Sequence, residues 1–181
     1  MERSFLASLP LVAPPGSADY LLSPGADEGT VALYFSAHWC PPCRRFTPLL
    51  SAFVREWDEA AAESDDEADR DPAVATPGNH LTCVFVSRDQ NEEAFREYHE
   101  TMCFPAVAFD AHEAREALLA RYNIQSLPTL LVVDAGTGEA RTWHRPAEDI
   151  RQSVADPLSA YPSFPRTTVL QRVQGWGQKS A

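Results

Sequence analysis

The sequence has no long hydrophobic run and few cysteines. No segment approaches the run of about 18 apolar residues that a membrane-spanning helix requires, so we expect no membrane partner. The chain has four cysteines in 181 residues, which is too few for the disulfide framework of a small secreted domain. The first 16 residues carry one arginine beside a glutamate and make a poor signal or transit peptide. These absences predict a cytoplasmic protein.

Metal-binding patterns are also scarce. Cys40 and Cys43 have the spacing of a zinc half-site, but no second CxxC and no HxxxH accompanies them, and a structural zinc ion takes four ligands. Cys83 falls in a predicted strand, where it is a small apolar residue. Cys103 falls in a predicted loop without a neighbour that would lower its thiol pKa, so we favour an inert loop residue over a regulatory thiol. The sequence therefore predicts no metal and no bound cofactor.

Much of the negative charge is concentrated in one segment. The formal net charge is −11, and residues 58–71 hold eight of the 26 acidic residues but one of the 15 basic residues. The wider stretch 58–79 is acidic, rich in alanine and ends in Pro-Gly-Asn. Its composition favours a helix extension that fades into a loop over a docking element for a basic partner. This charge argues against nucleic acid as a partner.

The region 31–57 predicts a strand, a turn and a helix. Residues 31–35 (VALYF) are apolar and favour a buried strand. The turn carries residues 40–43 (CPPC), and the helix starts at or within this motif. Pro48 lies inside the helix and is expected to kink it. The buried stripe of this helix has helical spacing and consists of Phe46, Leu49, Leu50, Phe53, Val54 and Trp57.

Two cysteines at the start of a helix can close and reopen a disulfide. The reactive form is the thiolate, which the unpaired N–H groups and the dipole of the first helical turn favour. Cys40 lies at the outer end of the motif, where a partner can reach it, while Cys43 lies one turn into the helix. We therefore assign Cys40 as the attacking nucleophile and Cys43 as the resolving thiol. The strand–CxxC–helix context favours this redox chemistry over zinc binding.

Three stretches of the chain resemble one protein family. Residues 39–43 (WCPPC), preceded by YFSA, are similar to the tryparedoxin and nucleoredoxin branch of the thioredoxin superfamily, whereas ordinary thioredoxins have WCGPC. Residues 126–129 (SLPT) and 89–92 (DQNE) match as well. The resemblance implies an α/β domain at 1–165 with the thioredoxin fold, in which helices flank a central mixed sheet. Residues 58–79 are then an acidic insertion after the active-site helix, and 166–181 form a C-terminal tail.

The resemblance also implies a set of site residues. Pro128 is expected in the cis form, with the backbone of Leu127 facing the CxxC motif, where it can pair with an extended substrate. An ordinary edge-strand proline is the alternative. Tyr34 stands where thioredoxins bury a carboxylate, so Tyr34 or a water is expected to serve in proton transfer. Three further residues are expected to support substrate binding: Trp39, Pro41 and Pro42.

For function, the resemblance implies a thiol–disulfide oxidoreductase of tryparedoxin type. Such a protein passes electrons from the dithiol trypanothione to disulfide-bearing proteins such as peroxiredoxin-type peroxidases, and we expect a monomer. Arg88 and Phe104 stand where the family has tryptophan, on surfaces expected to recognise partners. The resemblance therefore does not fix the identity of the electron donor. One alternative is a nucleoredoxin-like reductase with another donor. The other is a non-catalytic adaptor that binds through the acidic insertion or the tail.

Apolar and polar patterns predict the remaining elements. A capping box of Asp89 and Glu92 is expected to start a helix whose apolar face holds Phe95, Tyr98 and Met102. The predicted boundaries are strands 9–12, 81–87, 130–133 and 139–144, helices 91–101, 113–122 and 146–154, and a hairpin loop at 134–138. Four N-terminal residues are expected core contacts: Phe5, Leu6, Leu9 and Val12.

Overall fold

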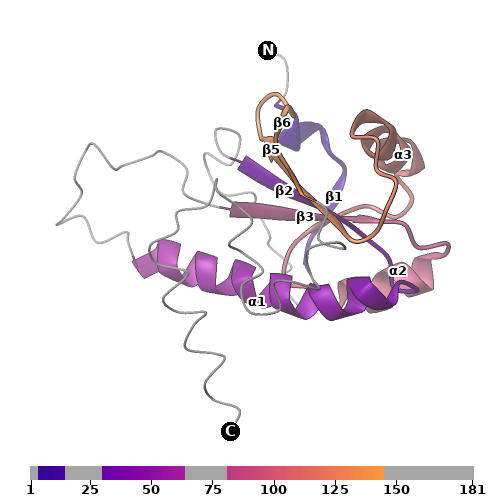
Figure 1. The fold of residues 1–181 in the computed structure, drawn as a ribbon, viewed down its shortest axis with the longest axis horizontal. Helices are drawn as coiled ribbons and strands as arrows, with labels where there is room; N and C mark the ends of the chain where they lie inside the picture. Colours follow the sequence, from indigo (N-terminus) through magenta and orange to yellow (C-terminus); the bar gives the residue numbers. More distant parts are fainter. Residues whose placement is uncertain (1–3, 15–29, 64–80, 145–181) are drawn as a thin grey trace, which may run out of the picture.

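The computed structural model describes residues 4–14, 30–63 and 81–144. Within these ranges six strands form one mixed sheet in the order β1-β4-β3-β2-β5-β6, and α-helices flank it (Figure 1). The strands are β1 (Leu11–Val12), β2 (Thr30–Ser36), β3 (Leu81–Ser87), β4 (Ala106–Val107), β5 (Thr129–Asp134) and β6 (Ala140–His144). The helices are α1 (Pro41–Glu63), α2 (Glu92–His99), α3 (His112–Arg121) and a 3-10 helix, η1 (Leu6–Ser8). This arrangement confirms the predicted α/β architecture.

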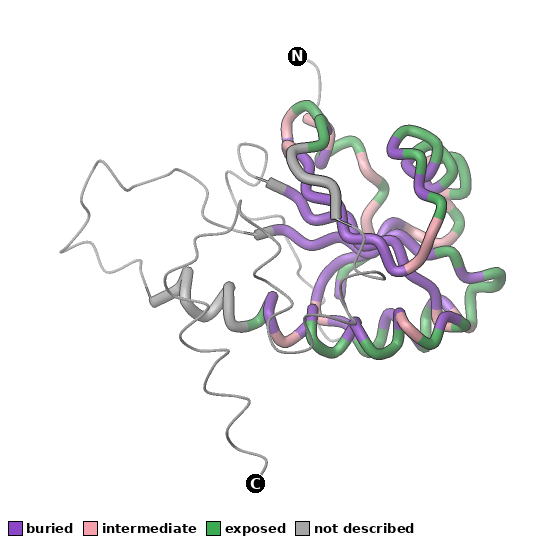
Figure 2. The backbone as a smooth tube through the Cα atoms, viewed as in Figure 1, coloured by how far each residue is buried: buried purple, intermediate pink, exposed green. Residues whose placement is uncertain are grey.

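Strand β2 lies at the centre of the sheet, and its side chains alternate between two cores. It pairs in parallel with β3 and antiparallel with β5. Ala32 and Tyr34 contact the core that α1 and α2 cover, whereas Leu33 and Phe35 contact the core that α3 covers. Successive strand residues point to opposite faces of the sheet. Because both faces are covered here, apolar side chains are found on both. Figure 2 shows this buried centre of the sheet.

Where the burial of α1 is described, its buried face differs from the predicted stripe at one position, and Trp57 of that stripe lies outside the residues whose side chains are described. Leu49 is 46% exposed, so its predicted place in the core is wrong. Thr47 and Ser51 are buried instead. Successive residues of a helix are turned by about 100° about its axis. Thr47 and Ser51 extend the buried face on one side, and Leu49 lies beyond its other side. The helix is continuous through Pro48, and the buried apolar residues are Phe46, Leu50, Phe53 and Val54.

Helix α2 is shorter than predicted, and a different residue caps it. The Asn91 side-chain oxygen accepts the N–H of Ala94 at 2.8 Å. The predicted capping box of Asp89 and Glu92 is wrong. Asp89 lies two residues before the cap, and its buried carboxylate accepts the hydroxyl of Ser87 at 2.8 Å instead. The expected apolar face is confirmed, since its three residues are buried: Phe95, Tyr98 and Met102.

The N-terminal segment packs against the core beneath α3. Leu6, in η1, is fully buried, and Phe5 and Leu9 are partly buried against the same cluster. Val12 is 36% exposed, which corrects its expected core contact. Strand β1 is the edge strand of the sheet and pairs only with β4 among the described strands. A residue of an edge strand has a neighbouring strand on one side only, so its side chain has fewer neighbours on the sheet face.

The predicted hairpin joins the antiparallel strands β5 and β6. Its Gly138 has a φ of +68°, which glycine adopts without steric cost. Helix α1 ends at Glu63, so residues 58–63 of the expected insertion belong to this helix. The rest of that stretch (64–79), the predicted helix 146–154 and the tail 166–181 lie outside the described residues. No described helix is long and apolar enough to span a bilayer.

Candidate active site

The two cysteines of the motif lie where β2 passes into α1. The Cys40 N–H donates to the Ala37 carbonyl at 3.2 Å, and the Cys40 carbonyl accepts the N–H of Arg44 at 3.1 Å. Cys40 therefore holds the position just before the first helical turn. Cys40 and Cys43 form a disulfide with Cα atoms 5.2 Å apart. Cys40 is 5% exposed and Cys43 is fully buried, so an incoming molecule can reach only the first sulfur.

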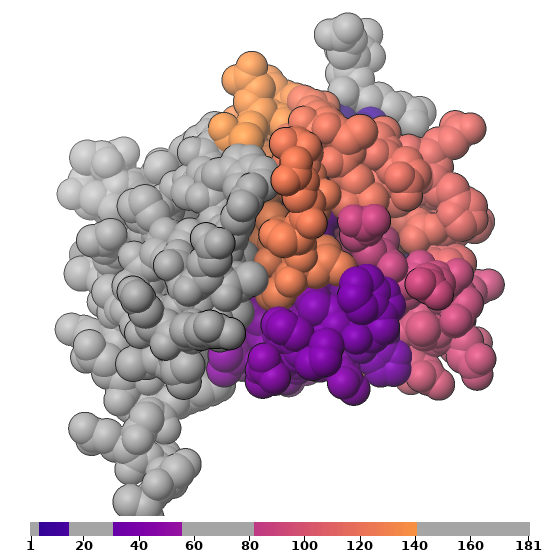
Figure 3. All heavy atoms as spheres, turned by 45° about the vertical axis from the view of Figure 1, so that its right-hand side comes forward, coloured from indigo at the N-terminus to yellow at the C-terminus, as the bar shows by residue number. Residues whose placement is uncertain are grey.

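A second loop faces this disulfide from the start of β5. The Leu127–Pro128 peptide bond is cis, which confirms the predicted isomer. The Leu127 carbonyl oxygen lies 4.0 Å from the Cys40 sulfur. Figure 3 shows the segments of α1 (purple) and α2 (magenta) and the residues before β5 (orange) side by side on one face. The backbone of Leu127 is thus placed beside the accessible cysteine.

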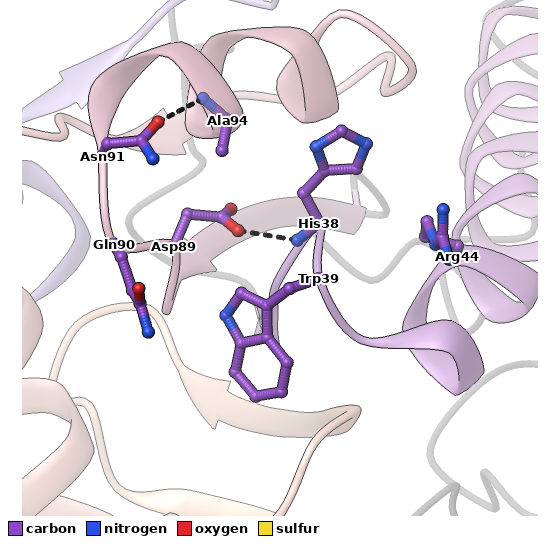
Figure 4. Close-up of a pocket in the computed structure, with 7 residues that line it drawn as sticks. All are labelled: His38, Trp39, Arg44, Asp89, Gln90, Asn91 and Ala94. Atoms are coloured by element: carbon purple, nitrogen blue, oxygen red, sulfur yellow. Dashed lines mark hydrogen bonds between the residues drawn. The ribbon is translucent and has the colours of Figure 1, made fainter.

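The loop between β3 and α2 holds the motif from the other side. The indole N–H of Trp39 donates to the Arg88 carbonyl at 3.2 Å, although the side chain is 59% exposed. The backbone N–H of His38 donates to Asp89 Oδ1 at 2.7 Å (Figure 4). Sequence reasoning placed Asp89 at a helix cap and missed this contact. The available signal was its position at the end of a strand that runs parallel to β2.

A cluster of hydroxyl groups lies beneath Cys43. The Tyr34 hydroxyl is 2.9 Å from Thr47 Oγ1 and accepts the hydroxyl of Ser36 at 3.1 Å. The Thr47 hydroxyl donates to the Cys43 carbonyl at 3.0 Å, and Tyr98 contacts both Ser36 and Thr47. Burial, and then the neighbouring Tyr98, raise the pKa of Tyr34 well above its usual range. Tyr34 therefore stays a neutral phenol that takes part in hydrogen bonds, and its raised pKa makes it a poorer proton donor than an ordinary tyrosine.

A hollow of about 370 Å³ lies beside Trp39. Its walls come from the motif, from the loop after β3 and from the first turn of α2, and Figure 4 shows its lining residues. The His38 ring stacks on Tyr98 with centroids 5.5 Å apart, and its Nδ1 lies 3.9 Å from Glu97. Arg44 is exposed on the α1 side of the hollow. This hollow offers polar side chains beside the motif.

The remaining candidate residues lie apart from the disulfide. Cys83 is buried in β3, and Cys103 is half-buried with its thiol 3.3 Å from the Ser51 carbonyl. Among the described residues, no group of three or more potential ligands is placed to hold a metal ion. Arg88 is exposed, but Phe104 is 2% exposed and packs edge-on against Tyr34. The expected surface role of Phe104 is therefore wrong, because this ring belongs to the core.

Comparison with known proteins agrees with this geometry. Nucleoredoxin of Mus musculus is 38% identical over 108 residues, which are 59% of this chain and 21% of that protein. Tryparedoxin of Trypanosoma brucei brucei is 35% identical over 109 residues, 60% of this chain and 63% of that protein. The match thus covers less than two thirds of either relative. The structure of tryparedoxin from Trypanosoma brucei has a TM-score of 0.61 at 30% identity, covering 87% of this chain and 90% of that chain.

A family model described as thioredoxin-like matches residues 28–140, which is more than half of the chain. These residues include β2, the CPPC motif, the cis-proline loop and β5. The tryparedoxin I structure from Leishmania major shares the arrangement as well, with a TM-score of 0.62 at 29% identity and coverage of 88% of this chain and 92% of that chain. The thioredoxin fold predicted from the motif is thus confirmed, and the chain belongs to the thioredoxin-like family.

Proposed function

We propose that this protein is a thiol–disulfide oxidoreductase of tryparedoxin type, with Cys40 as the nucleophile and Cys43 as the resolving thiol. The observation that carries the proposal is the asymmetry of the disulfide. Cys40 keeps a small exposed fraction (5%) beside the Leu127 carbonyl, whereas Cys43 is fully buried. The helix N-terminus at Cys40 favours a thiolate there. Only the outer sulfur can meet a second protein.

The reaction is a two-step exchange. In the reduced protein the Cys40 thiolate attacks one sulfur of the client disulfide, that S–S bond breaks, and one client thiolate leaves. The Cys43 thiolate then attacks the Cys40 sulfur, which releases the second client thiol and closes the Cys40–Cys43 disulfide. Two electrons pass from the protein to the client. A thiol donor reduces the Cys40–Cys43 disulfide by the same exchange, so no bound cofactor is needed.

The surrounding residues orient the client in this scheme. The Leu127 carbonyl can accept a backbone N–H from an extended client segment. The exposed ring of Trp39, held by its hydrogen bond to Arg88, offers an apolar surface beside Cys40. Pro41 and Pro42 lack backbone N–H groups, which suits the first helical turn. Tyr34 supports the motif from beneath through the hydroxyl cluster.

For the donor we propose a low-molecular-weight dithiol such as trypanothione, and for the clients peroxiredoxin-type peroxidases. Support comes from the tryparedoxin relatives. One solved tryparedoxin II, with a TM-score of 0.61 at 28% identity, is described as complexed with glutathionylspermidine. Such exchange requires thiols kept reduced, so we propose the cytoplasm as the compartment and a monomer as the working form.

A nucleoredoxin-like reductase with another thiol donor is the second candidate. The similarity to mouse nucleoredoxin favours it. The exposed cation Arg88 beside the motif favours it as well, because it would repel trypanothione, which carries positive charge. In the third candidate, a non-catalytic adaptor, the motif would form a disulfide without turnover.

The test is reduction of the Cys40–Cys43 disulfide by trypanothione, by glutathione and by a thioredoxin reductase system, measured side by side. We expect fast reduction by trypanothione and subsequent turnover of a disulfide client. The Cys40→Ser variant is the control and should be inactive with each donor. Reduction by glutathione or thioredoxin reductase alone would establish the second candidate. Failure with all three donors would contradict both reductase proposals.

A further inference from the structure

A second hollow lies between the loop after β3 and the start of α3. Its volume is about 240 Å³, and its walls include Arg88, Asp89, Phe109, His112, Arg115 and Glu116. It shares Asp89 and Gln90 with the hollow beside Trp39, so the turn between β3 and α2 separates two adjoining depressions. The second hollow therefore adjoins the hollow beside Trp39.

The buried cation of this hollow is Arg115. Its side chain projects from the first turn of α3 and is 7% exposed. One terminal nitrogen donates to the Ser87 carbonyl at 3.3 Å, and the other lies 2.6 Å from His112 Nδ1. The guanidinium also lies 4.5 Å above the centre of the Phe109 ring. These contacts fix the group in place without neutralising its charge.

The charge of Arg115 lacks a close counter-charge. No carboxylate of the described residues lies within ion-pair distance of Arg115, and its Nε–H has no hydrogen-bond partner. Asp89, Asp110 and Glu116 act on it only at longer range, and burial lowers its pKa from the ordinary value. A buried charge without a partner is costly. A negatively charged ligand would remove that cost.

Two further features favour an anion at this place. The cap residue of α3 is Ala111, which has no side-chain group to accept the first N–H groups of the helix. The Asp110 carbonyl accepts the N–H of His112, and Glu113 is the acidic residue of this turn. The helix dipole favours negative charge at the N–H groups that remain.

Arg88, on the opposite wall, adds a second cation that is exposed. Asp89 and Glu116 also line the hollow and offset part of this positive charge. The two Asp89 oxygens point to other partners, since they accept the His38 N–H and the Ser87 hydroxyl.

We propose that this hollow is a carboxylate-binding subsite that takes an acidic side chain of the client protein. The inference rests on the proposed reductase function, since it assigns a recognition site to the same client. Arg115 donates to the Ser87 carbonyl, and the Ser87 hydroxyl donates to Asp89. Asp89 in turn accepts the N–H of His38, just before the motif. An acidic residue near the client disulfide would thus dock while that disulfide faces Cys40.

The test uses two peptide pairs that differ by one Glu-to-Gln change near a cystine. One pair carries the disulfide and reports kcat/KM for reduction, and the other lacks it and reports binding to the oxidised protein. We expect the Glu peptide to be preferred about five- to tenfold in both assays. The preference should shrink toward unity in ~1 M salt, where the screening length is about 3 Å.

Substitutions assign the effect to the hollow. Arg115→Met should abolish the preference, and Glu116→Gln should increase it. Each variant is its own control, because the preference is the ratio between the Glu and Gln peptides measured on the same protein. If Arg115→Met fails to fold, as judged by circular dichroism, then the exposed Arg88→Gln variant carries the test and should lower the preference. Equal binding of the two peptides by the parent protein, or an unchanged preference in Arg115→Met or in Arg88→Gln, would overturn the subsite. Failure to reduce either peptide would count against the reductase function, while the binding assay still decides the subsite.

Discussion

At the scale of single residues, Asp89 connects the sheet to the reactive motif. Its carboxylate accepts the His38 backbone N–H and the Ser87 hydroxyl, and its own N–H donates back to Ser87 at 2.9 Å. Asp89 is 6% exposed, so water cannot replace these bonds without cost. The position of Trp39 and Cys40 depends on this contact, because His38 directly precedes them.

We predict that Asp89→Asn lowers the free energy of unfolding by about 1–3 kcal/mol. An asparagine offers one acceptor oxygen where the carboxylate offers two, so one buried donor loses its partner. Urea denaturation of the oxidised protein measures the change. Asp110→Asn, at an exposed site, is the matched control and should have little effect. Equal stability of Asp89→Asn and the parent would show that Asp89 does not hold the motif.

His99 is a second informative residue, because burial lowers its pKa from the ordinary value. Its Nε2 lies 2.9 Å from the Phe104 carbonyl, so the neutral ring donates there. The unfolded chain takes up a proton at His99 near pH 6.5 (about the ordinary value), and the folded chain does so only at lower pH. We predict that the free energy of unfolding decreases as the pH falls below about 6.5, and that His99 contributes no pH dependence above it.

Urea denaturation across about pH 5 to 8, applied to the parent protein and to His99→Gln, checks this prediction. The variant should lose part of the decrease on the acid side, because its side chain takes up no proton in either state. Two identical pH profiles would mean that His99 titrates alike in the folded and unfolded chains.

At the scale of elements, α1 both carries the motif and closes one core. Its inward face includes Leu50, which is 4% exposed, while the neighbouring Leu49 is 46% exposed. Both residues fit the apolar spacing in the sequence. The difference arises because Thr47 and Ser51 enter the core, where the Thr47 hydroxyl bonds to the Cys43 carbonyl.

The two adjacent leucines provide a matched pair of substitutions. Leu50→Ala should lower the free energy of unfolding by about 2–4 kcal/mol, since it leaves a cavity in the core. Leu49→Ala should change it by about 0.5 kcal/mol or less, as is usual for exposed sites. Chemical denaturation of both variants measures the contrast. A larger loss for Leu49→Ala than for Leu50→Ala would place the buried face where the sequence pattern first predicted it.

The elements of the site were largely predictable because each has a local signature. The apolar run of β2, the CPPC motif at a helix start and the proline before β5 each follow from a few neighbouring residues. The errors concern long-range contacts. Asp89 has the spacing of a capping residue, yet it turns inward to a loop that lies 51 positions earlier in the chain. Arg115 gave no signal, because its burial depends on Phe109 and on the end of β3.

At the scale of the whole molecule, the sheet order brings three separate segments to one face. The motif follows β2, and the cis-proline loop precedes the adjacent strand β5. On the other side, the loop that accepts hydrogen bonds from His38 and Trp39 follows β3. Because β2 lies between β3 and β5, its C-terminal end is enclosed on both sides. This placement leaves Cys40 reachable and Cys43 buried, which is the basis of their proposed roles.

The most direct test of these roles is trapping of a mixed disulfide. The reduced Cys43→Ser variant is mixed with a disulfide-bearing client, and the covalent product is mapped by mass spectrometry, with Cys40→Ser as the parallel sample. We predict a stable client adduct at Cys40 in Cys43→Ser, since the resolving thiol is missing, and no adduct in Cys40→Ser. An adduct at Cys43 that forms as readily as the one at Cys40 would contradict the assignment of Cys40 as the nucleophile.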